Sequence, residues 1–137
     1  MPLYGLTSNK YLSTATKQKL ANLFTDAHCS LMIAPEQFVH VVFFEGIPLI
    51  ENKSLYVHAN VRLGRTQNQI DQLCEAVTKG CSEILKVSED KIHINLMEID
   101  GKWAMEGGFV MPSPGEEDEW MEKVTKALSD REEVLTE

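Results

Sequence analysis

The chain has 137 residues, of which 43% are hydrophobic and 25% charged, and its formal net charge is −8. This length is typical of one domain, and the composition is that of an ordinary globular protein that needs no disulfide or metal to stabilise it. The acidic balance argues against nucleic acid and against an anionic membrane surface as the main partner. We therefore expect a single domain over residues 1–137 that uses no cofactor.

The N-terminus and the cysteines both favour a reduced, cytoplasmic setting. No basic start followed by an apolar run is present, and no apolar stretch approaches the roughly 20 residues that cross a bilayer. Cys29, Cys74 and Cys81 form no C-x-x-C pattern, so neither a disulfide framework nor a zinc site is expected.

The first third of the chain reads as strand, helix, strand. Residues 3–7 are prone to form a strand, and Ser13 is a candidate N-cap for a helix that Pro35 would end. Residues 39–44 are rich in β-branched and aromatic types and read as a buried strand. Between the two strands apolar residues recur at helical spacing: Leu20, Phe24, Ala27, Leu31 and Ala34.

The next third repeats this pattern at a constant offset of 53 residues. Glu36, His40 and Glu45 align without gaps with Glu89, His93 and Glu98. Residues 55–61 and 92–97 read as strands, and Thr66 is the N-cap of the intervening helix. The apolar stripe of that helix comprises Ile70, Leu73, Val77, Cys81 and Ile84. We place the first repeat at about residues 2–46 and the second at about residues 54–99.

Two fused β-α-β units predict an α/β sandwich of the α+β type. Each crossover helix implies parallel pairing within its unit, and both helices should lie on one face of a single sheet. The other face would stay open and apolar, which predicts a homo-oligomer.

From about residue 100 the pattern changes to turns and a last helix. Glycines and prolines surround a short segment at residues 103–111. A helix is expected from about residue 116 to 128, with Trp120, Val124 and Leu128 on one stripe, and residues 130–137 read as a frayed acidic tail.

The Met-Pro start together with the repeat resembles the tautomerase superfamily, whose members range from 4-oxalocrotonate tautomerase to macrophage migration inhibitory factor. The longer pattern is similar to the cis-3-chloroacrylic acid dehalogenase branch, in which two β-α-β units are fused. The resemblance spans nearly the whole chain. It rests on Thr25-Asp26-Ala27-His28, Arg62-Leu63-Gly64-Arg65, Glu106 before two glycines, Pro112-Ser113-Pro114-Gly115 and Glu119-Trp120.

This resemblance implies a homotrimer and a set of site residues. Pro2, Glu106 and Arg65 are the implied catalytic residues, and His28 and Arg62 join Arg65 as donors to a substrate carboxylate. The branch also has a tyrosine, and Asn95 stands at its expected position, where it can bind a water or a carbonyl but cannot act as an acid or base near pH 7. From the residues alone, the two arginines can be read as surface charges or as a forked donor pair for a carboxylate, and His28 can be read as a packing residue.

The chemistry centres on Pro2, which is a secondary amine once Met1 is removed. Desolvation and nearby cations lower the pKa of such an amine toward the neutral range that acid–base catalysis needs. At the equivalent position the second repeat has Leu55, so one site per chain is expected.

Two reactions on a small carboxylate fit this set. One is keto–enol tautomerisation of a 2-oxo acid; the other is hydration or dehalogenation of a three-carbon unsaturated acid by water that Glu106 activates. The rival hypothesis is a non-catalytic trimer that binds protein partners.

Overall fold

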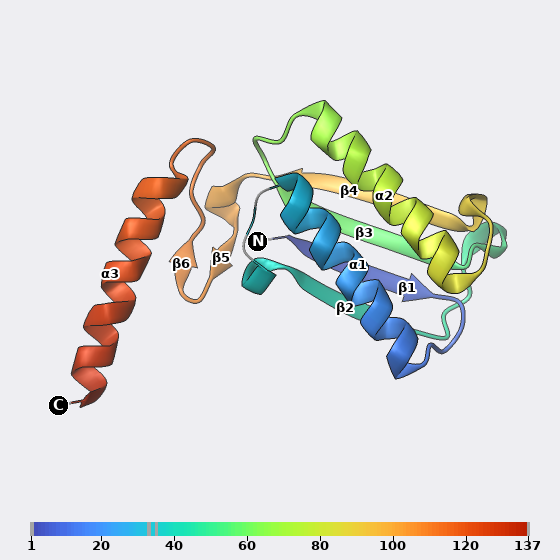
Figure 1. The fold of residues 1–137 in the computed structure, drawn as a ribbon, viewed down its shortest axis with the longest axis horizontal. Coiled ribbons are helices and arrows are strands. Elements are labelled where there is room, and N and C mark those ends of the chain that lie inside the picture. The colour runs from blue at the N-terminus through green and yellow to red at the C-terminus, as the bar shows by residue number, and fades with distance from the viewer. Residues whose placement is uncertain (1, 33, 35, 137) are drawn as a thin grey trace.

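The computed structural model describes residues 2–32, 34 and 36–136, and its elements follow the expected order (Figure 1). The strands and helices are β1 (Leu3–Ser8), α1 (Thr14–Met32), β2 (His40–Phe44), β3 (Leu55–Arg62), α2 (Gln67–Leu85), β4 (Ile92–Ile99), β5 (Met105–Glu106), β6 (Phe109–Val110) and α3 (Glu117–Thr136).

The two β-α-β units form one mixed sheet in the order β2-β1-β3-β4. β1 pairs in parallel with β2, β3 pairs in parallel with β4, and the units meet through the antiparallel pair β1 and β3. Figure 1 shows α1 and α2 side by side on one face of this sheet. The prediction of parallel units with both helices on one face is therefore confirmed.

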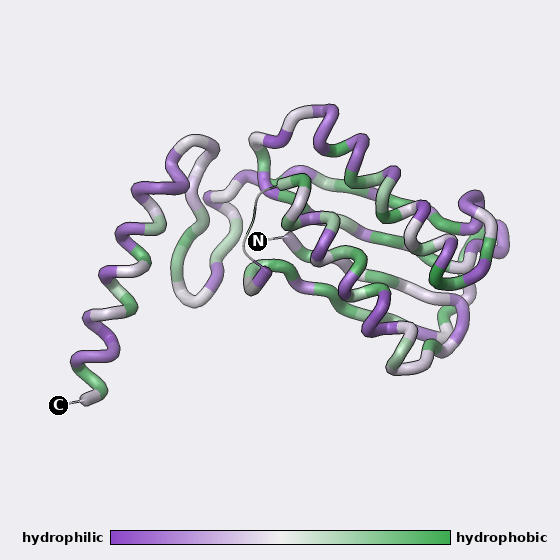
Figure 2. The backbone as a smooth tube through the Cα atoms, viewed as in Figure 1, coloured by the Kyte–Doolittle hydropathy of each residue, from purple (hydrophilic) through white to green (hydrophobic). Residues whose placement is uncertain are grey.

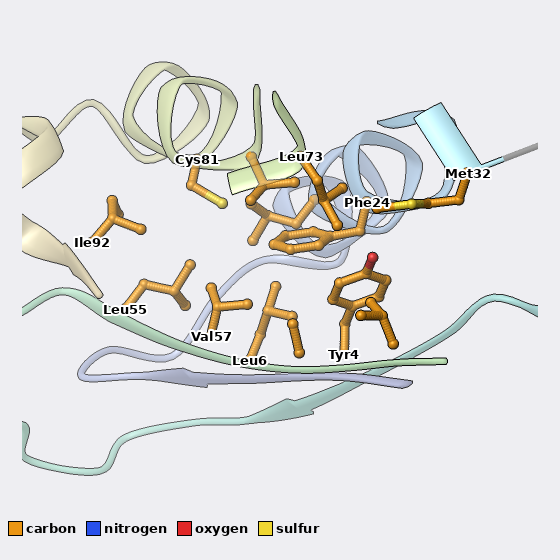
Figure 3. Packing of buried hydrophobic residues seen from close by; sticks show 13 residues of the cluster. Tyr4, Leu6, Phe24, Met32, Leu55, Val57, Leu73, Cys81 and Ile92 are labelled. Atoms are coloured by element: carbon orange, nitrogen blue, oxygen red, sulfur yellow. The ribbon is translucent and has the colours of Figure 1, made fainter. Parts of the chain in front are cut away.

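The core lies between that face and the two helices. Alternate residues of β1 and β3, among them Tyr4, Leu6, Val57 and Val61, are at most 1% exposed and pack against the buried stripes of α1 and α2. Figure 3 shows these side chains filling the layer between sheet and helices. Cys81 belongs to this core, and all three cysteines are free thiols.

Both predicted N-caps are present. The Ser13 hydroxyl accepts a hydrogen bond from the Thr16 N–H across 3.1 Å at the start of α1. Thr66 begins α2 with a capping box, in which its hydroxyl accepts from the Gln69 N–H and the Gln69 side chain accepts from the Thr66 N–H. α1 ends at Met32, before Ala34, and the expected helix breaker Pro35 lies outside the described residues.

The open face of the sheet is mixed, so the expectation of an apolar face was wrong in part. Val42, Phe44 and Met97 are 43%, 51% and 56% exposed there, and polar His58 and Asn95 are exposed beside them. Figure 2 shows the same interruption of hydrophobic stretches along the strands. Strand alternation determines which residues reach this face, but it does not make them all apolar.

The last helix is longer than the sequence predicted. α3 continues to Thr136, so residues 130–136 are helical and the expected frayed tail is wrong over that range. The guanidinium of Arg131 stacks over the Phe109 ring, 4.8 Å from its centroid, and ties the second half of α3 to β6. The apolar stripe predicted from the sequence ends at Leu128, so it did not indicate this contact.

Figure 1 shows α3 standing apart from the sheet, beyond the β5–β6 hairpin. Of the helices in the described part of the chain, none is long and apolar enough to cross a membrane.

Candidate active site

Four of the predicted site residues meet at one cavity. A space of about 420 Å³ lies where β1 begins, α1 ends and β3 ends. Pro2, His28, Arg62 and Arg65 all contribute to its wall. Residues from α3 and the segment before it complete the lining: Met111, Pro112, Glu117, Trp120 and Met121.

Pro2 is buried at the edge of this cavity, immediately before β1. Its carbonyl accepts a hydrogen bond from the His40 N–H across 3.1 Å, which joins it to the first residue of β2. This bond involves only the Pro2 carbonyl. It therefore holds Pro2 in place without using its ring nitrogen.

The two arginines have different surroundings. Arg62 donates from Nη1 to the Pro112 carbonyl and from Nη2 to the Glu117 carboxylate, each across 3.2 Å. Within the described ranges, the buried Nε of Arg65 has no hydrogen-bond partner. Desolvation, followed by the positive charge of Arg62, lowers the pKa of the Arg65 guanidinium below its ordinary value. A buried donor without an acceptor is costly, so Arg65 is the cation best placed to gain from an incoming carboxylate.

The backbone between the arginines is fixed by local contacts. Gly64 has a φ of +102°, and a Cβ there would lie 2.6 Å from Pro114 Cγ. Only glycine allows both the conformation and the close approach. The Arg62-Leu63-Gly64-Arg65 turn therefore packs directly on the Pro112-Ser113-Pro114-Gly115 segment, which explains why both motifs occur in one chain.

The side chain of Gln69 links the two helices beside this turn. Its Nε2 donates to the Leu31 carbonyl near the end of α1 across 2.9 Å. Because Gln69 also completes the Thr66 capping box, one side chain sets the start of α2 against the end of α1.

His28 lines the cavity from α1 and is only 1% exposed. Its Nδ1 lies 2.6 Å from the Tyr4 hydroxyl, which projects from β1. Burial, followed by the charge of Arg65, lowers the pKa of His28 to about 4. His28 is therefore a neutral imidazole at neutral pH, and Nε2 is the ring nitrogen left for the cavity.

The first turn of α3 forms the outer wall, which sequence reasoning missed. The Trp120 indole donates to the Val110 carbonyl across 2.6 Å, and its ring meets Phe38 edge-on at 6.3 Å between centroids. The sequence placed Trp120 on the apolar stripe of this helix, but periodicity does not show which element it packs against. Glu117 lay in an acidic run that resembles a solvated helix start, so nothing in the sequence pointed to its contact with Arg62.

Glu106 and Asn95 do not line the cavity of their own chain. Glu106 lies on β5 with its side chain 12% exposed, and its Oε1 is 3.7 Å from His40 Nε2. Asn95, on β4, pairs with His58 of β3 and is exposed on the sheet face opposite the helices. Strand alternation directs its side chain away from the cavity.

A second, smaller cavity of about 230 Å³ occupies the equivalent position in the repeat. At the offset of 53 residues, Leu85 and Val87 replace Met32 and Ala34, and Asn9 and Leu12 replace Arg62 and Arg65. The fold therefore builds this hollow twice, and the two arginines line only the first copy. No cluster of three or more His, Cys, Asp or Glu side chains suited to a metal occurs in the part of the chain that the structure describes.

Known proteins were compared by sequence and by structure. No protein-family model matches the chain, and no curated protein matches it significantly. Solved structures do match. N1, a member of the cis-3-chloroacrylic acid dehalogenase (cis-CaaD) family, has 26% identity and a TM-score of 0.78, over 93% of this chain and 99% of its own.

Two further structures share the fold. Ps01740 has 26% identity and a TM-score of 0.70, over 76% of this chain and 99% of its own. F6 fused 4-OT, an asymmetric trimer, has 17% identity and a TM-score of 0.71, over 79% of this chain and 94% of its own. At 17% identity the likeness to F6 fused 4-OT concerns the fold alone. The duplicated β-α-β sheet, the motifs around the cavity and the likeness to N1 together support the assignment of this chain to the tautomerase superfamily, as a cis-3-chloroacrylic acid dehalogenase-like protein.

Proposed function

We propose that this chain is an enzyme that uses the Pro2 amine, freed by removal of Met1, to interconvert the keto and enol forms of a 2-oxo acid. The observation that carries the proposal is the meeting of Pro2, His28, Arg62 and Arg65 at one cavity. The repeat-related cavity has none of these residue types at the matching positions, so the fold alone does not require them.

Binding begins with the substrate carboxylate. Arg65 Nε offers a buried donor, and a charge-assisted hydrogen bond to a carboxylate satisfies it. The neutral His28 ring adds a donor without adding charge. The apolar wall of Met32, Met111 and Met121 then surrounds the carbon end of the acid and excludes water.

The reaction itself is a proton transfer at C3. Neutral Pro2 removes a proton from C3 of the keto acid, and the electron pair of the broken C–H bond forms the enolate. The guanidinium groups stabilise the charge that develops on the 2-oxygen. A proton from solvent on that oxygen gives the enol, and Pro2 releases the proton taken from C3 to solvent. In the reverse direction protonated Pro2 returns the proton to C3. Burial beside two cations favours a neutral amine, which is the form that the forward step requires.

The second candidate is hydration or dehalogenation of a three-carbon unsaturated acid, and the likeness to N1 favours it. In this reaction Glu106 activates a water that attacks C3, and protonated Pro2 delivers a proton to C2. We rank it second because it also needs Glu106, which does not line the cavity of its own chain, and because Asn95 stands where the branch has a tyrosine.

We also propose that the working form is a homotrimer. The exposed Val42, Phe44 and Met97 on the open sheet face support association, as does the trimeric state of F6 fused 4-OT. The rival class is a trimer on the same scaffold that only binds protein partners.

The deciding experiment is covalent labelling followed by intact mass. The structure of Pt0534 is of a protein inactivated by 2-oxo-3-pentynoate, an electrophilic 2-oxo acid that suits this cavity. We expect the purified chain to begin at Pro2, to gain one adduct on that residue, and to lose turnover of a 2-oxo acid in proportion to labelling.

Two variants sharpen this test. Pro2→Ala should lower kcat by about 100-fold or more, in line with the usual contribution of a general acid–base group. Pro48→Ala, which changes an exposed proline that does not line the cavity, should leave labelling and turnover unchanged. A chain that retains Met1, or a free Pro2 that neither labels nor matters for turnover, would favour the protein-binding rival.

A further inference from the structure

The pair Tyr4 and His28 is a buried hydrogen bond between the sheet and α1. Its atoms are 2.6 Å apart, and the two residues are 0% and 1% exposed. The rings also meet edge-on, with centroids 5.7 Å apart. Figure 3 shows the Tyr4 hydroxyl pointing from the sheet toward the helix layer. His28 lines the cavity, whereas Tyr4 lies behind it.

We propose that Tyr4 is a positioning residue that holds His28 as the neutral tautomer protonated on Nε2, with that N–H available to the substrate carboxylate. This inference rests on the proposed function for its substrate, but the tautomer itself does not depend on turnover.

The donor and acceptor roles follow from burial and from the lack of another partner: within the described residues His28 Nδ1 is the one hydrogen-bond partner of the Tyr4 hydroxyl, so a buried O–H that did not donate to it would stay unsatisfied. Burial is the main cause that raises the pKa of the Tyr4 phenol above its ordinary value, so the hydroxyl keeps its proton. Burial also keeps the imidazole neutral, and a neutral imidazole has one donor nitrogen and one acceptor nitrogen. With the Tyr4 O–H donating to Nδ1, the ring proton must reside on Nε2.

The second repeat shows that this pair is not needed for packing. At the offset of 53 residues, Val57 and Cys81 take the places of Tyr4 and His28, and both are at most 1% exposed. The same layer of the same fold is thus filled there by two side chains that form no comparable hydrogen bond. The Tyr4–His28 bond lies beside the cavity that Arg62 and Arg65 line, and the repeat-related Val57 has no hydroxyl to form such a bond, which is why we assign it to function.

The test variant is Tyr4→Phe, which removes one oxygen and keeps the ring against Phe24, 5.0 Å away between centroids. The control is Tyr56→Phe, which removes the same oxygen on β3 from a ring that contacts His93 at a tilt on the open face. For all three proteins the tautomer of His28 is read without substrate from its ring ¹⁵N resonances, and KM and kcat are measured with a 2-oxo acid.

We expect wild type and Tyr56→Phe to show His28 protonated on Nε2 alone. In Tyr4→Phe the Nδ1 acceptor loses its donor, so the ring should populate both tautomers and the pKa of His28 should rise. KM should increase roughly tenfold, as expected for loss of a hydrogen bond to a charged group, while kcat changes much less.

His28 protonated on Nδ1 in the wild type, or an unchanged tautomer and KM in Tyr4→Phe, would overturn the inference. A protein with the expected tautomers but no turnover of any 2-oxo acid would instead overturn the proposed function. In that case a substrate carboxylate would no longer be the expected acceptor of the Nε2 proton.

Discussion

The carboxylate of Glu117 accepts a hydrogen bond from the Arg62 guanidinium across 3.2 Å, at the mouth of the cavity that holds Pro2. One of the two cations near the site is therefore paired with the first residue of α3 before any substrate arrives. The other, Arg65, keeps a buried Nε without an acceptor in the described residues.

This contact makes Glu117 a competitor of the substrate carboxylate. Glu117→Gln should lower KM for a 2-oxo acid by about two- to fivefold and leave kcat nearly unchanged, because a partly exposed ion pair contributes at most about 1 kcal/mol. The control is Glu116→Gln, which removes the same charge from an exposed neighbour outside the cavity lining. An equal fall in KM for both variants would indicate a general effect of charge.

Replacement of Arg65 by lysine, which keeps the charge but changes the shape of the cation, should raise KM more than the same replacement at an arginine outside the cavity. Arg65→Lys keeps the charge but removes the Nε donor, so KM should rise about tenfold. Arg131→Lys, at the chain's third arginine, serves as the matched control, since that residue stacks on Phe109 outside the cavity. An Arg65→Lys variant with wild-type KM would mean that this donor does not bind substrate.

Gly64 should tolerate no side chain. In Gly64→Ala the new Cβ would clash with Pro114 and strain a residue with φ of +102°, so we expect a loss of about 2 kcal/mol in the free energy of unfolding and a raised KM. Gly115→Ala is the control for strain alone. It also has a positive φ, but its Cβ would meet nothing within 4 Å, so the loss should be nearer to 1 kcal/mol with KM unchanged. Urea denaturation and steady-state kinetics give both quantities.

The low pKa of His28 predicts a specific acid sensitivity. The folded state holds this ring neutral down to about pH 4, whereas the unfolded chain protonates it near pH 6.5. His28 therefore does not lower the free energy of unfolding above pH 6.5. As the pH falls toward 4, the unfolded chain binds a proton that the folded chain does not, and the free energy of unfolding falls by about 2 to 3 kcal/mol in total.

This loss is measurable by urea denaturation of wild type and His28→Gln at pH 7 and pH 4. The wild type should lose more stability over this range than the variant, which cannot titrate at that position. Equal losses would contradict a buried, neutral His28.

Most of the fold was predictable because local rules determine it. The strands and the caps at Ser13 and Thr66 come from short-range patterns. The repeat then shows two β-α-β units, and the crossover helix of each unit implies parallel pairing. The extent of α3 was not predictable, because the contact of Arg131 with Phe109 joins residues whose packing no periodicity reports.

The site was only partly predictable for the same reason. The resemblance pointed to Pro2, His28, Arg62 and Arg65, and the structure brings these four to one cavity. It also pointed to Glu106 and Asn95, whose side chains lie elsewhere in the single chain. The roles of Tyr4 and Glu117 depend on distances between β1 and α1 and between β3 and α3. Patterns within single helices and strands do not give these distances.

The two cavities related by the repeat also bear on how this chain tolerates mutation. Because Asn9, Leu12, Leu85 and Val87 line a hollow without the reactive groups, the residues around it are held only to the requirement that the chain fold. Substitutions of equal size should accumulate freely around the second hollow, while the repeat-related residues around the first hollow should resist change. A saturation library scored for turnover would then show two structurally matched hollows under unequal selection, one preserved for its chemistry and the other only for its shape.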